Sequence, residues 1–516
     1  MIKDLIESLC VPGALHPLGI KKVIETHISY VLLDGNYAYK IKKPVNLGFV
    51  NFASLGKRKF YCEEEIRLNK RMAPDLYIGT ISITGTVSEP EIDGGGPILE
   101  YAVKMIQFPR ENELSNLLGS AVNLSVLFHT FCIELASFHK TIAVAGSSSK
   151  FSDSERISSP NIQNFRSIDS ALLAPKESKI LKRLKQWTLN SLEKNNDAFI
   201  KRQADGRIRE CHGDLHLGNL VCIDSRIVAF DCLEFNEQLR WVDVASELAF
   251  LVMDLFANNK PELARGCLDW YLEESGDYDL IPLFQHYLVY RAMVRAKVSF
   301  LSGLKSKKEN NQKAFSQYLH LADRLASPKP KPKLIITHGF SGCGKTWISN
   351  KIVTQTDCIR VRSDVIRKHL HGLGVRDLSS RKNSEPIYTI ESDLITYSHL
   401  QEIALKILTA GYPVLIDATF LSKENRKSFR LLSESIDVDF CILDLQADIS
   451  VLKSRITKRQ QSGNDASEAG IKVLENQLKS ANPLDQFEQQ QAIVLNTDKD
   501  FVDVKTLIKE LKLDTL

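Results

Sequence analysis

The stretch that most constrains the fold is residues 339–346, which read GFSGCGKT and fit the pattern G-x-x-x-x-G-K-[ST] at every fixed position. An apolar run, residues 334–336, precedes it, and a helix-compatible segment, residues 347–352, follows. This strand–loop–helix order distinguishes a phosphate-binding loop from a chance match. The glycines allow a tight turn whose N–H groups can point at phosphate oxygens, next to the positive end of a helix dipole. The alternative is a glycine-rich turn that binds nothing.

Within this loop each fixed residue has an expected task. Lys345 would reach the β- and γ-phosphates, and Thr346 would offer its hydroxyl to Mg²⁺. The predicted nucleotide contacts are Gly339, Ser341, Gly342, Cys343, Gly344, Lys345 and Thr346.

Length and composition indicate a globular chain with more than one core. At 516 residues the chain exceeds one ordinary domain, and its 43% apolar and 25% charged residues are typical of soluble proteins. The net charge of +4 does not by itself indicate nucleic acid.

Ten scattered cysteines without a C-x-x-C pair favour reduced thiols in the cytoplasm. Residues 1–10 lack a signal-peptide core, and residues 244–256 carry acids that favour a buried helix over a membrane span.

A proline–lysine segment, residues 327–333 (SPKPKPK), marks the predicted domain boundary. Alternating prolines favour an extended, stiff connector, and the lysines between them are expected to keep it solvated. An ordered loop lying on one domain is the alternative. The predicted domains are residues 1–326 and 334–516, each long enough for its own core.

In the first domain, residues 29–42 predict a β-hairpin, with D-G-N between two apolar and aromatic runs. Lys40 and Lys42 then lie on one face of the second strand. A helical pattern with several glutamates follows over residues 60–72. A strand lysine and a helix glutamate anchor the α- and β-phosphates in kinase-type sites, although such residues also occupy solvated faces.

The residues most specific for chemistry follow at 211–220, which read CHGDLHLGNL. Asp214 and Asn219 lie five apart on a turn-like stretch, and Asp231 ends a short apolar strand. One general base and two Mg²⁺ ligands around a triphosphate would have this arrangement. The i, i+4 pair His212 and His216 could instead be a metal pair or structural, but no third ligand at suitable spacing supports zinc.

The pattern H-G-D-L-H-L-G-N followed by F-D resembles the catalytic segment of aminoglycoside phosphotransferase and choline-kinase-like enzymes. The resemblance implies an α+β, protein-kinase-like bilobal fold, with a small lobe at about residues 1–108 and a large lobe at about 109–326. It also implies that Asp214 is the catalytic base and that Asn219 and Asp231 bind Mg²⁺.

The same resemblance assigns the phosphate anchors. The strand lysine matches Lys40, with Lys42 as the alternative, and its partner matches Glu65, with Glu64 as runner-up. No glycine-rich loop precedes the hairpin, because residues 25–29 (ETHIS) occupy its place. The resemblance therefore implies phosphotransfer but does not imply antibiotic substrates.

The second domain alternates strand-like and helix-like segments, as a parallel α/β sheet does. Asp364 follows the predicted strand 359–362, where it could accept a proton, and Arg367 could hold an anion. Asp417 ends another buried strand, where it could hold Mg²⁺ through water or orient the substrate. Helix caps and a solvated charge are the alternatives for these three residues.

The segment 451–459 places Arg455 and Arg459 on one helix face, and the polar stretch 460–467 follows. Arginines beside a flexible segment indicate a lid that closes over a nucleotide, and an exposed charged helix is the alternative.

Together, the phosphate loop, R-S-D-V-I-R, V-L-I-D-A-T-F and R-x-x-x-R resemble the P-loop kinases of the polynucleotide-kinase and gluconate-kinase type over nearly all of 334–516. This resemblance implies an α/β P-loop fold with a parallel sheet. It makes Asp364 the candidate base and Arg459 a lid arginine, and it makes Arg367 and Arg426 substrate contacts.

The sequence therefore predicts a cytoplasmic ATP-dependent phosphotransferase with two ATP–Mg²⁺ sites and a small hydroxylated acceptor. One alternative makes the first domain a nucleotide-binding pseudokinase that regulates the second. Another makes the second domain a nucleic-acid 5′-hydroxyl kinase, which the absence of a basic stripe with interleaved aromatics disfavours. No membrane association is expected, and the sequence gives no indication of oligomeric state.

Overall fold

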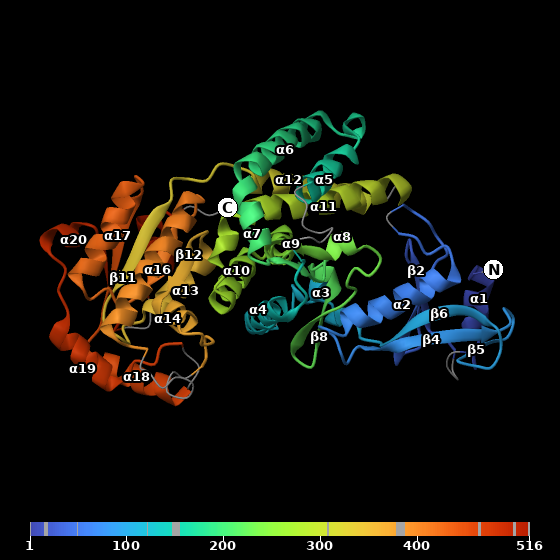
Figure 1. Cartoon of the computed structure of the whole chain (residues 1–516), viewed down its shortest axis with the longest axis horizontal. Coiled ribbons are helices and arrows are strands. Elements are labelled where there is room, and N and C mark those ends of the chain that lie inside the picture. The colour runs from blue at the N-terminus through green and yellow to red at the C-terminus, as the bar shows by residue number, and fades with distance from the viewer. Residues whose placement is uncertain are drawn as a thin grey trace. The chain divides into compact units, whose positions relative to one another are not determined.

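The computed structural model describes most of the chain (Figure 1). The described ranges are 2–14, 19–48, 50–120, 122–146, 155–306, 309–377, 387–462, 466–498 and 502–513. The chain forms two compact units. Unit 1 comprises Met1–Glu134, Phe138–Arg156 and Arg202–Asp254, and unit 2 comprises Leu135–Ser137, Ile157–Lys201 and Leu255–Leu516.

Unit 1 contains a six-stranded antiparallel sheet in the order β1-β2-β3-β6-β4-β5. Its strands are β1 (Lys22–Glu25), β2 (Ser29–Leu33), β3 (Tyr37–Lys42), β4 (Tyr77–Gly85), β5 (Pro90–Ile92) and β6 (Ile98–Ile106). The predicted hairpin is confirmed, because Asp34 Oδ1 accepts hydrogen bonds from the N–H groups of Asn36 and Tyr37 and closes the β2–β3 turn. Helix α2 (Leu55–Asn69) contacts β4 and β6, so it brings its glutamates to the sheet.

Unit 1 also contains two short two-stranded antiparallel sheets. The strands β7 (Ile208–Glu210) and β10 (Trp241–Asp243) pair with each other, as do β8 (Leu220–Ile223) and β9 (Arg226–Ala229). The 3₁₀ turn η3 (Leu217–Asn219) leads into β8. Helices α4 (Leu124–Thr141) and α9 (Val244–Ala257) carry many buried apolar residues. Among the described residues, no helix combines the length and apolarity needed to cross a membrane.

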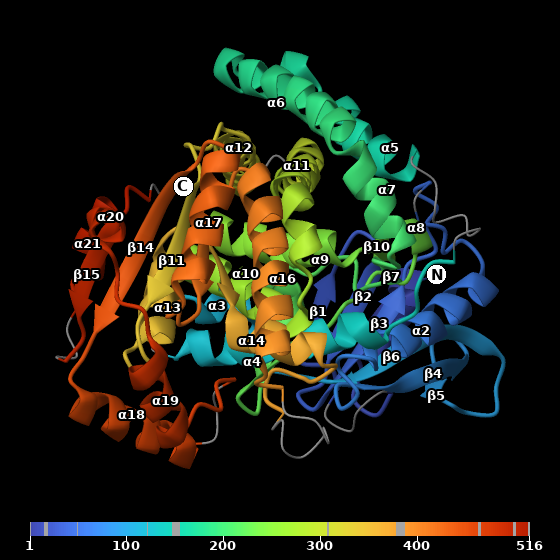
Figure 2. The same ribbon diagram turned by 60° about the vertical axis from the view of Figure 1, so that its left-hand side comes forward.

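Unit 2 contains a five-stranded parallel sheet in the order β12-β13-β11-β14-β15. The strands are β11 (Lys333–His338), β12 (Ile359–Arg362), β13 (Val414–Asp417), β14 (Asp439–Gln446) and β15 (Ala492–Asn496). Helices α16 (Ile390–Thr409) and α17 (Lys423–Ser435) contact each other and lie against one face of this sheet (Figure 2). Helices α13 (Lys345–Gln355) and α21 (Val504–Glu510) also pack together, and an apolar cluster that includes Ile335, Ile348 and Leu507 joins them to the sheet.

Unit 2 also includes helices that precede the proline–lysine segment. Among them are α6 (Pro175–Lys194), α10 (Pro261–Ser275), α11 (Ile281–Ser306) and α12 (Glu309–Leu325). Helix α10 contacts α13 and β12, and α11 contacts α16. The compact units therefore do not divide at the proline–lysine segment, and the boundary at 327–333 stays a prediction about folding.

One lysine of the proline–lysine segment is less solvated than the composition predicts. The Lys329 ammonium lies over the ring of Tyr412, and burial lowers the pKa of Lys329 to about 7. Lys331 pairs with Asp437 at 3.0 Å. Lys331 and both of the first two prolines are exposed, so Lys329 is where the segment differs from the prediction, because an aromatic face offers this lysine a partner that composition does not reveal.

A buried histidine in unit 2 leads to a prediction about acid stability. The His286 ring is stacked with Trp187, its Nδ1 lies 3.0 Å from Ser191 Oγ, and its Nε2 is buried with no hydrogen-bond partner among the described residues. Burial lowers the pKa of His286 from 6.5 to about 4. Between these values the unfolded chain binds the proton and the folded chain does not, so stability falls as pH falls from 6.5 toward 4.

In the parent protein this histidine should lower the free energy of unfolding by roughly 1–2 kcal/mol between pH 7 and pH 5. We expect His286→Leu to remove that pH-dependent loss. The measurement is the urea midpoint of the full chain at the two pH values. The exposed His320 of α12 provides the control, since His320→Leu should keep the pH dependence of the parent. An unchanged pH dependence in His286→Leu would contradict the assignment.

Candidate active sites

The first candidate site brings together three residues that are distant in sequence. Lys40 extends from β3, Glu65 from α2, and Asp231 follows β9. Lys40 Nζ lies 2.8 Å from Glu65 Oε1 and also donates a hydrogen bond to Asp231 Oδ1. The structure thus places the predicted phosphate anchor beside a predicted metal ligand.

Lys42 and Glu234 extend this cluster in a way that the sequence did not predict. Lys42 Nζ lies 2.6 Å from Glu65 Oε2 and donates a second hydrogen bond to Glu234 Oε1, and both of its partners are buried. Burial would raise the pKa of Glu65, but the charges of Lys40 and Lys42 outweigh it and lower this pKa to about 2. Both lysines that the sequence offered as anchors therefore contact Glu65, whereas Glu64 pairs with Arg67 and Arg240.

Asp214 and Asn219 lie on one turn, as predicted. Asn219 Nδ2 donates to both the backbone carbonyl and the Oδ2 atom of Asp214, each at 3.0 Å. This orientation leaves the amide oxygen of Asn219 for a cation, and oxygen is the ligand that Mg²⁺ prefers. His216 Nε2 lies 3.4 Å from Asp214 Oδ2, so this histidine accompanies the carboxylate.

Asp231 adopts a backbone conformation that is uncommon for a residue other than glycine. Its φ is 61°, and its N–H donates to the hydroxyl of Tyr77 at 3.0 Å. The N–H of the preceding residue, Phe230, donates to the carbonyl of Asn219, which fixes both predicted metal ligands at the same end of the β8–β9 hairpin. Such left-handed residues cluster at functional sites, where the surrounding structure holds them.

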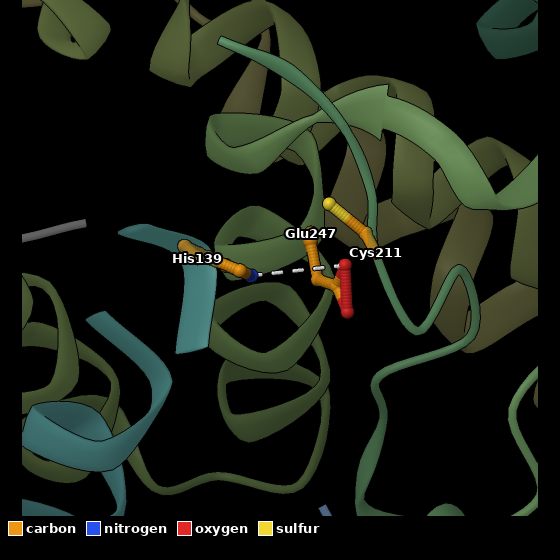
Figure 3. Close-up of side chains that lie close together, drawn as sticks. All are labelled: His139, Cys211 and Glu247. Atoms are coloured by element: carbon orange, nitrogen blue, oxygen red, sulfur yellow. Dashed lines mark ion pairs between the residues drawn. The ribbon is translucent and has the colours of Figure 1, made fainter. Parts of the chain in front are cut away.

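Beneath this turn lies a buried group of three side chains: His139, Cys211 and Glu247 (Figure 3). Their potential ligand atoms all lie within 4.8 Å of one another, and His139 Nε2 is 3.8 Å from Glu247 Oε2. Both carboxylate oxygens of Glu247 accept the N–H of His212, at 2.7 and 3.0 Å. Burial would raise the pKa of Glu247, but His139 and His212 outweigh it and lower it to about 2. The charged carboxylate thus anchors the backbone just before Asp214.

The second candidate site is the loop between β11 and α13. Gly339 has a φ of 141°, and a Cβ there would lie 2.5 Å from the carbonyl oxygen of Leu445. At Gly342, with a φ of 88°, a Cβ would lie 2.9 Å from the carbonyl oxygen of Leu452. Only glycine fits both positions, which agrees with the prediction that the glycines allow a tight backbone turn. Cys343 has a buried side chain, so only its backbone is available to a nucleotide.

Inside the loop the lysine and one amide already have protein partners. Lys345 Nζ donates to the carbonyls of Gly339 and Phe340 at 2.9 and 2.8 Å. The N–H of Ser341 donates to Oε1 of Gln477, from α19 (Ile471–Ser480), at 3.0 Å. A carboxamide oxygen therefore takes the position at which a phosphate oxygen would accept this N–H, and a nucleotide must displace it.

We expect Gln477→Ala to increase ATP affinity at this loop by about 2- to 10-fold, the range that corresponds to one net hydrogen bond. Gln477→Glu should have the opposite effect, because a carboxylate accepts the same N–H more strongly and repels phosphate. Equilibrium titration with a fluorescent ATP analogue measures both. Affinities that change in the same direction in the two variants would contradict this role of Gln477.

Asp417 and Thr346 are connected through one serine. Ser349 Oγ donates to Asp417 Oδ2 at 3.2 Å and to the backbone carbonyl of Thr346 at 3.1 Å. Asp417 is buried at the carboxyl end of β13, beside the strand that leads into the loop. Arg362 Nε lies 3.7 Å from Asp417 Oδ2. A carboxylate and a hydroxyl at this end of a parallel sheet are the oxygen donors that suit Mg²⁺.

Asp364 and Arg367 both lie on α14 (Ser363–Leu370), which follows β12. Asp364 is half-buried. Burial, and after it the charge of Asp364, raises the pKa of Tyr388. The Arg367 guanidinium lies over the Tyr388 ring and pairs with Asp393 at 2.7 Å. The structure thus places the two predicted residues around Tyr388, which the sequence did not single out.

The remaining predicted arginines have protein partners in the structure. Arg459 Nη2 donates to the carbonyl of Ala469 at 2.7 Å, which connects α18 (Ile449–Ser462) to the segment after it. Residues 463–465 of the predicted lid lie outside the described residues. Arg426 is buried and bonded to both carboxylate oxygens of Glu488, at 2.8 and 2.9 Å, and to backbone carbonyls. This placement does not fit the predicted substrate contact, because the guanidinium is already fully used inside the domain.

Comparisons with known proteins found a matching family model and a relative similar over most of the chain. Residues 334–484 match the AAA domain family. An uncharacterised protein of Mycobacterium tuberculosis is 24% identical over 458 residues, which are 88% of this chain and 89% of that protein.

Two solved structures are also similar. A choline kinase from Cryptosporidium parvum is 13% identical, with a TM-score of 0.36, and covers 63% of this chain and 95% of its own. A sugar kinase from Janibacter sp. is 21% identical, with a TM-score of 0.27, and covers 35% of this chain and 92% of its own.

The observed folds agree with the prediction from sequence. Unit 1 combines an antiparallel sheet with helices, as the predicted α+β fold requires, and unit 2 has the parallel sheet of the predicted α/β P-loop fold. The AAA domain match lies within the predicted P-loop domain and includes the phosphate loop.

Proposed function

We propose that the chain is a phosphotransferase with two separate ATP–Mg²⁺ sites, each of which transfers the γ-phosphoryl group to a hydroxyl of a small molecule in the cytoplasm. Two groups of residues carry the proposal. In the first, Lys40 contacts Glu65 and Asp231, and Asp231 lies at the same end of the β8–β9 hairpin as Asn219, which binds Asp214. The second is the complete phosphate loop, connected to Asp417 through Ser349. Each combines a lysine for phosphate with oxygen donors for a cation.

At the first site, Asp214 would accept the proton of the acceptor hydroxyl while Asn219 holds its carboxylate in place. Lys40 would exchange Asp231 for phosphate oxygens, and Glu65 would keep Lys40 oriented. Mg²⁺, bound through Asn219 and Asp231, would neutralise charge on the phosphates. Positioning and charge stabilisation would supply most of the rate enhancement.

At the second site, the loop amides and Lys345 would hold the triphosphate, and Thr346 with Asp417 would hold Mg²⁺. Asp364 would accept the acceptor's proton, and Arg367 would bind the acceptor. Arg459 would act from the lid once the nucleotide is bound. Arg426 is left out of this site because Glu488 already binds it.

The test is a screen for ADP release against a library of small hydroxylated metabolites, with the full chain and with Asp214→Ala and Lys345→Ala separately. We expect each substitution to remove turnover of its own acceptors and to leave the other set unchanged. If neither substitution lowers any ATP turnover, the two-site proposal fails.

A second candidate function is that the first site binds nucleotide without turnover and regulates the P-loop site. The β1–β2 connection favours it, because Thr26 Oγ1 closes a short turn by accepting the N–H of Ser29 at 2.9 Å, in the place of a glycine-rich phosphate cover. Calorimetry with ATP and Mg²⁺ on the full-length Lys345→Ala variant discriminates between the two. Tight binding without any turnover would support the regulatory function.

A further inference from the structure

A network of charged side chains connects α10 to the edge strand of the P-loop sheet. Arg360 forms two hydrogen bonds with Asp269, at 3.1 and 2.6 Å, and a third with Glu273 at 3.0 Å. Arg362, two residues further along β12, donates to Glu273 Oε1 at 2.6 Å. The network therefore crosses from a helix that precedes the proline–lysine segment to a strand that follows it.

The network ends at the acid assigned to the P-loop site. Arg362 Nη1 is hydrogen-bonded to Glu273, whereas Arg362 Nε forms a longer ion pair with Asp417 Oδ2 at 3.7 Å, which is beyond hydrogen-bond distance. Asp417 instead accepts the hydroxyl hydrogen of Ser349. The guanidinium thus lies between two carboxylates and is bonded to the one from α10.

This arrangement matters for a cation because the three side chains are mostly buried, with exposed fractions of 20% for Glu273, 10% for Arg362 and 5% for Asp417. In such surroundings a guanidinium hydrogen-bonded to Asp417 would compete with Mg²⁺ for its carboxylate, and its charge would repel the cation. Glu273 reduces both effects, because it binds the guanidinium and balances its charge.

We propose that Glu273 is a positioning residue of the P-loop site, which acts through Arg362 to keep the Asp417 carboxylate available to Mg²⁺. Helix α10 is then a functional part of that site although it lies before the proline–lysine segment. The proposal rests on the proposed function, because it assigns Asp417 to the Mg²⁺ site.

The test measures metal-dependent nucleotide binding by the full chain. Fluorescence of an N-methylanthraniloyl-ADP probe is titrated with Mg²⁺, and the part of the signal that Lys345→Ala removes is assigned to the P-loop site. In Glu273→Gln we expect the half-saturating Mg²⁺ concentration at this site to rise by about 5- to 10-fold, with metal-free nucleotide affinity unchanged. Glu262→Gln is the matched control, since Glu262 is an exposed glutamate on the same helix.

Two further variants separate positioning from damage to the fold. Glu273→Gln combined with Arg362→Gln should return the Mg²⁺ dependence toward that of the parent, because the guanidinium that Glu273 held away from Asp417 is gone. Glu273→Asp, which shortens the side chain but keeps its charge, should give an intermediate shift, and it also tests the proposal if Glu273→Gln does not fold.

Each outcome has a distinct meaning. If Lys345→Ala removes no signal, the P-loop site does not bind the nucleotide, and the proposed function fails. If Lys345→Ala removes signal but neither Glu273 variant shifts the Mg²⁺ dependence, the proposed function stands and the role of Glu273 is wrong. A shift that persists in the double variant would also overturn it, because the effect would not pass through Arg362.

Discussion

Replacing Lys345 with alanine is expected to lower phosphoryl transfer at the P-loop site by about two to three orders of magnitude, the loss typical when one charge-stabilising donor is removed. Its ammonium is bonded only to carbonyls of the loop and to the Cys343 sulfur among the described contacts, so nothing except the loop holds it before nucleotide arrives. The substitution removes a positive charge that would stabilise the transferring phosphoryl group.

The matched control is Lys351→Ala, which changes an exposed lysine on the same helix α13. Initial rates of ADP release should match those of the parent in this control and fall only in Lys345→Ala. If Lys345→Ala retained more than about a tenth of the P-loop rate, the lysine would not stabilise transferring charge as proposed.

The second large effect is expected on stability. Asp269→Ala should destabilise unit 2 by about 3–5 kcal/mol, because it leaves the guanidinium of Arg360 buried without its bidentate partner. The two side chains expose only 7% and 5% of their surface, and the Tyr278 hydroxyl donates to the Arg360 carbonyl at 3.3 Å, which ties the strand further to this region. Hydrogen exchange of the β12 amides, followed over a series of urea concentrations, measures this loss in the free energy of unfolding.

Two comparisons make this stability prediction specific. Glu262→Ala on the same helix is exposed and should change the midpoint little. The double variant Asp269→Leu with Arg360→Met should recover most of the loss, because a buried ion pair can be replaced by apolar packing at little cost. A double variant as unstable as Asp269→Ala would show that the loss does not come from the stranded charge.

The sequence predicted those parts of the sites that depend on local pattern. The phosphate loop needs glycine at Gly339 and Gly342 because a Cβ there would collide with a backbone carbonyl. Both glycines belong to one short motif, so the sequence alone reveals this requirement. The turn that holds Asp214 and Asn219 is likewise local, since the two side chains are bonded across five residues. Alternation along β3 also placed two lysines on one face.

The parts that the sequence did not predict depend on partners far along the chain. Gln477 reaches the loop from 136 residues away, and nothing in its own segment marks it. Arg426 fits a helix-start pattern, but its burial follows from Glu488, 62 residues later. Charged residues such as Arg362 and Glu273 look like solvated charges in sequence, because pattern alone does not say which helix will cover a strand.

The most direct test of the central claim is the number of nucleotides bound per chain. Equilibrium dialysis with a non-hydrolysable ATP analogue and Mg²⁺ should give two bound nucleotides for the full chain and one for Lys345→Ala. The Lys40→Ala variant should also bind one, and the two variants combined should bind none. A full chain that saturates at one nucleotide, with that binding abolished by Lys345→Ala alone, would contradict the two-site account.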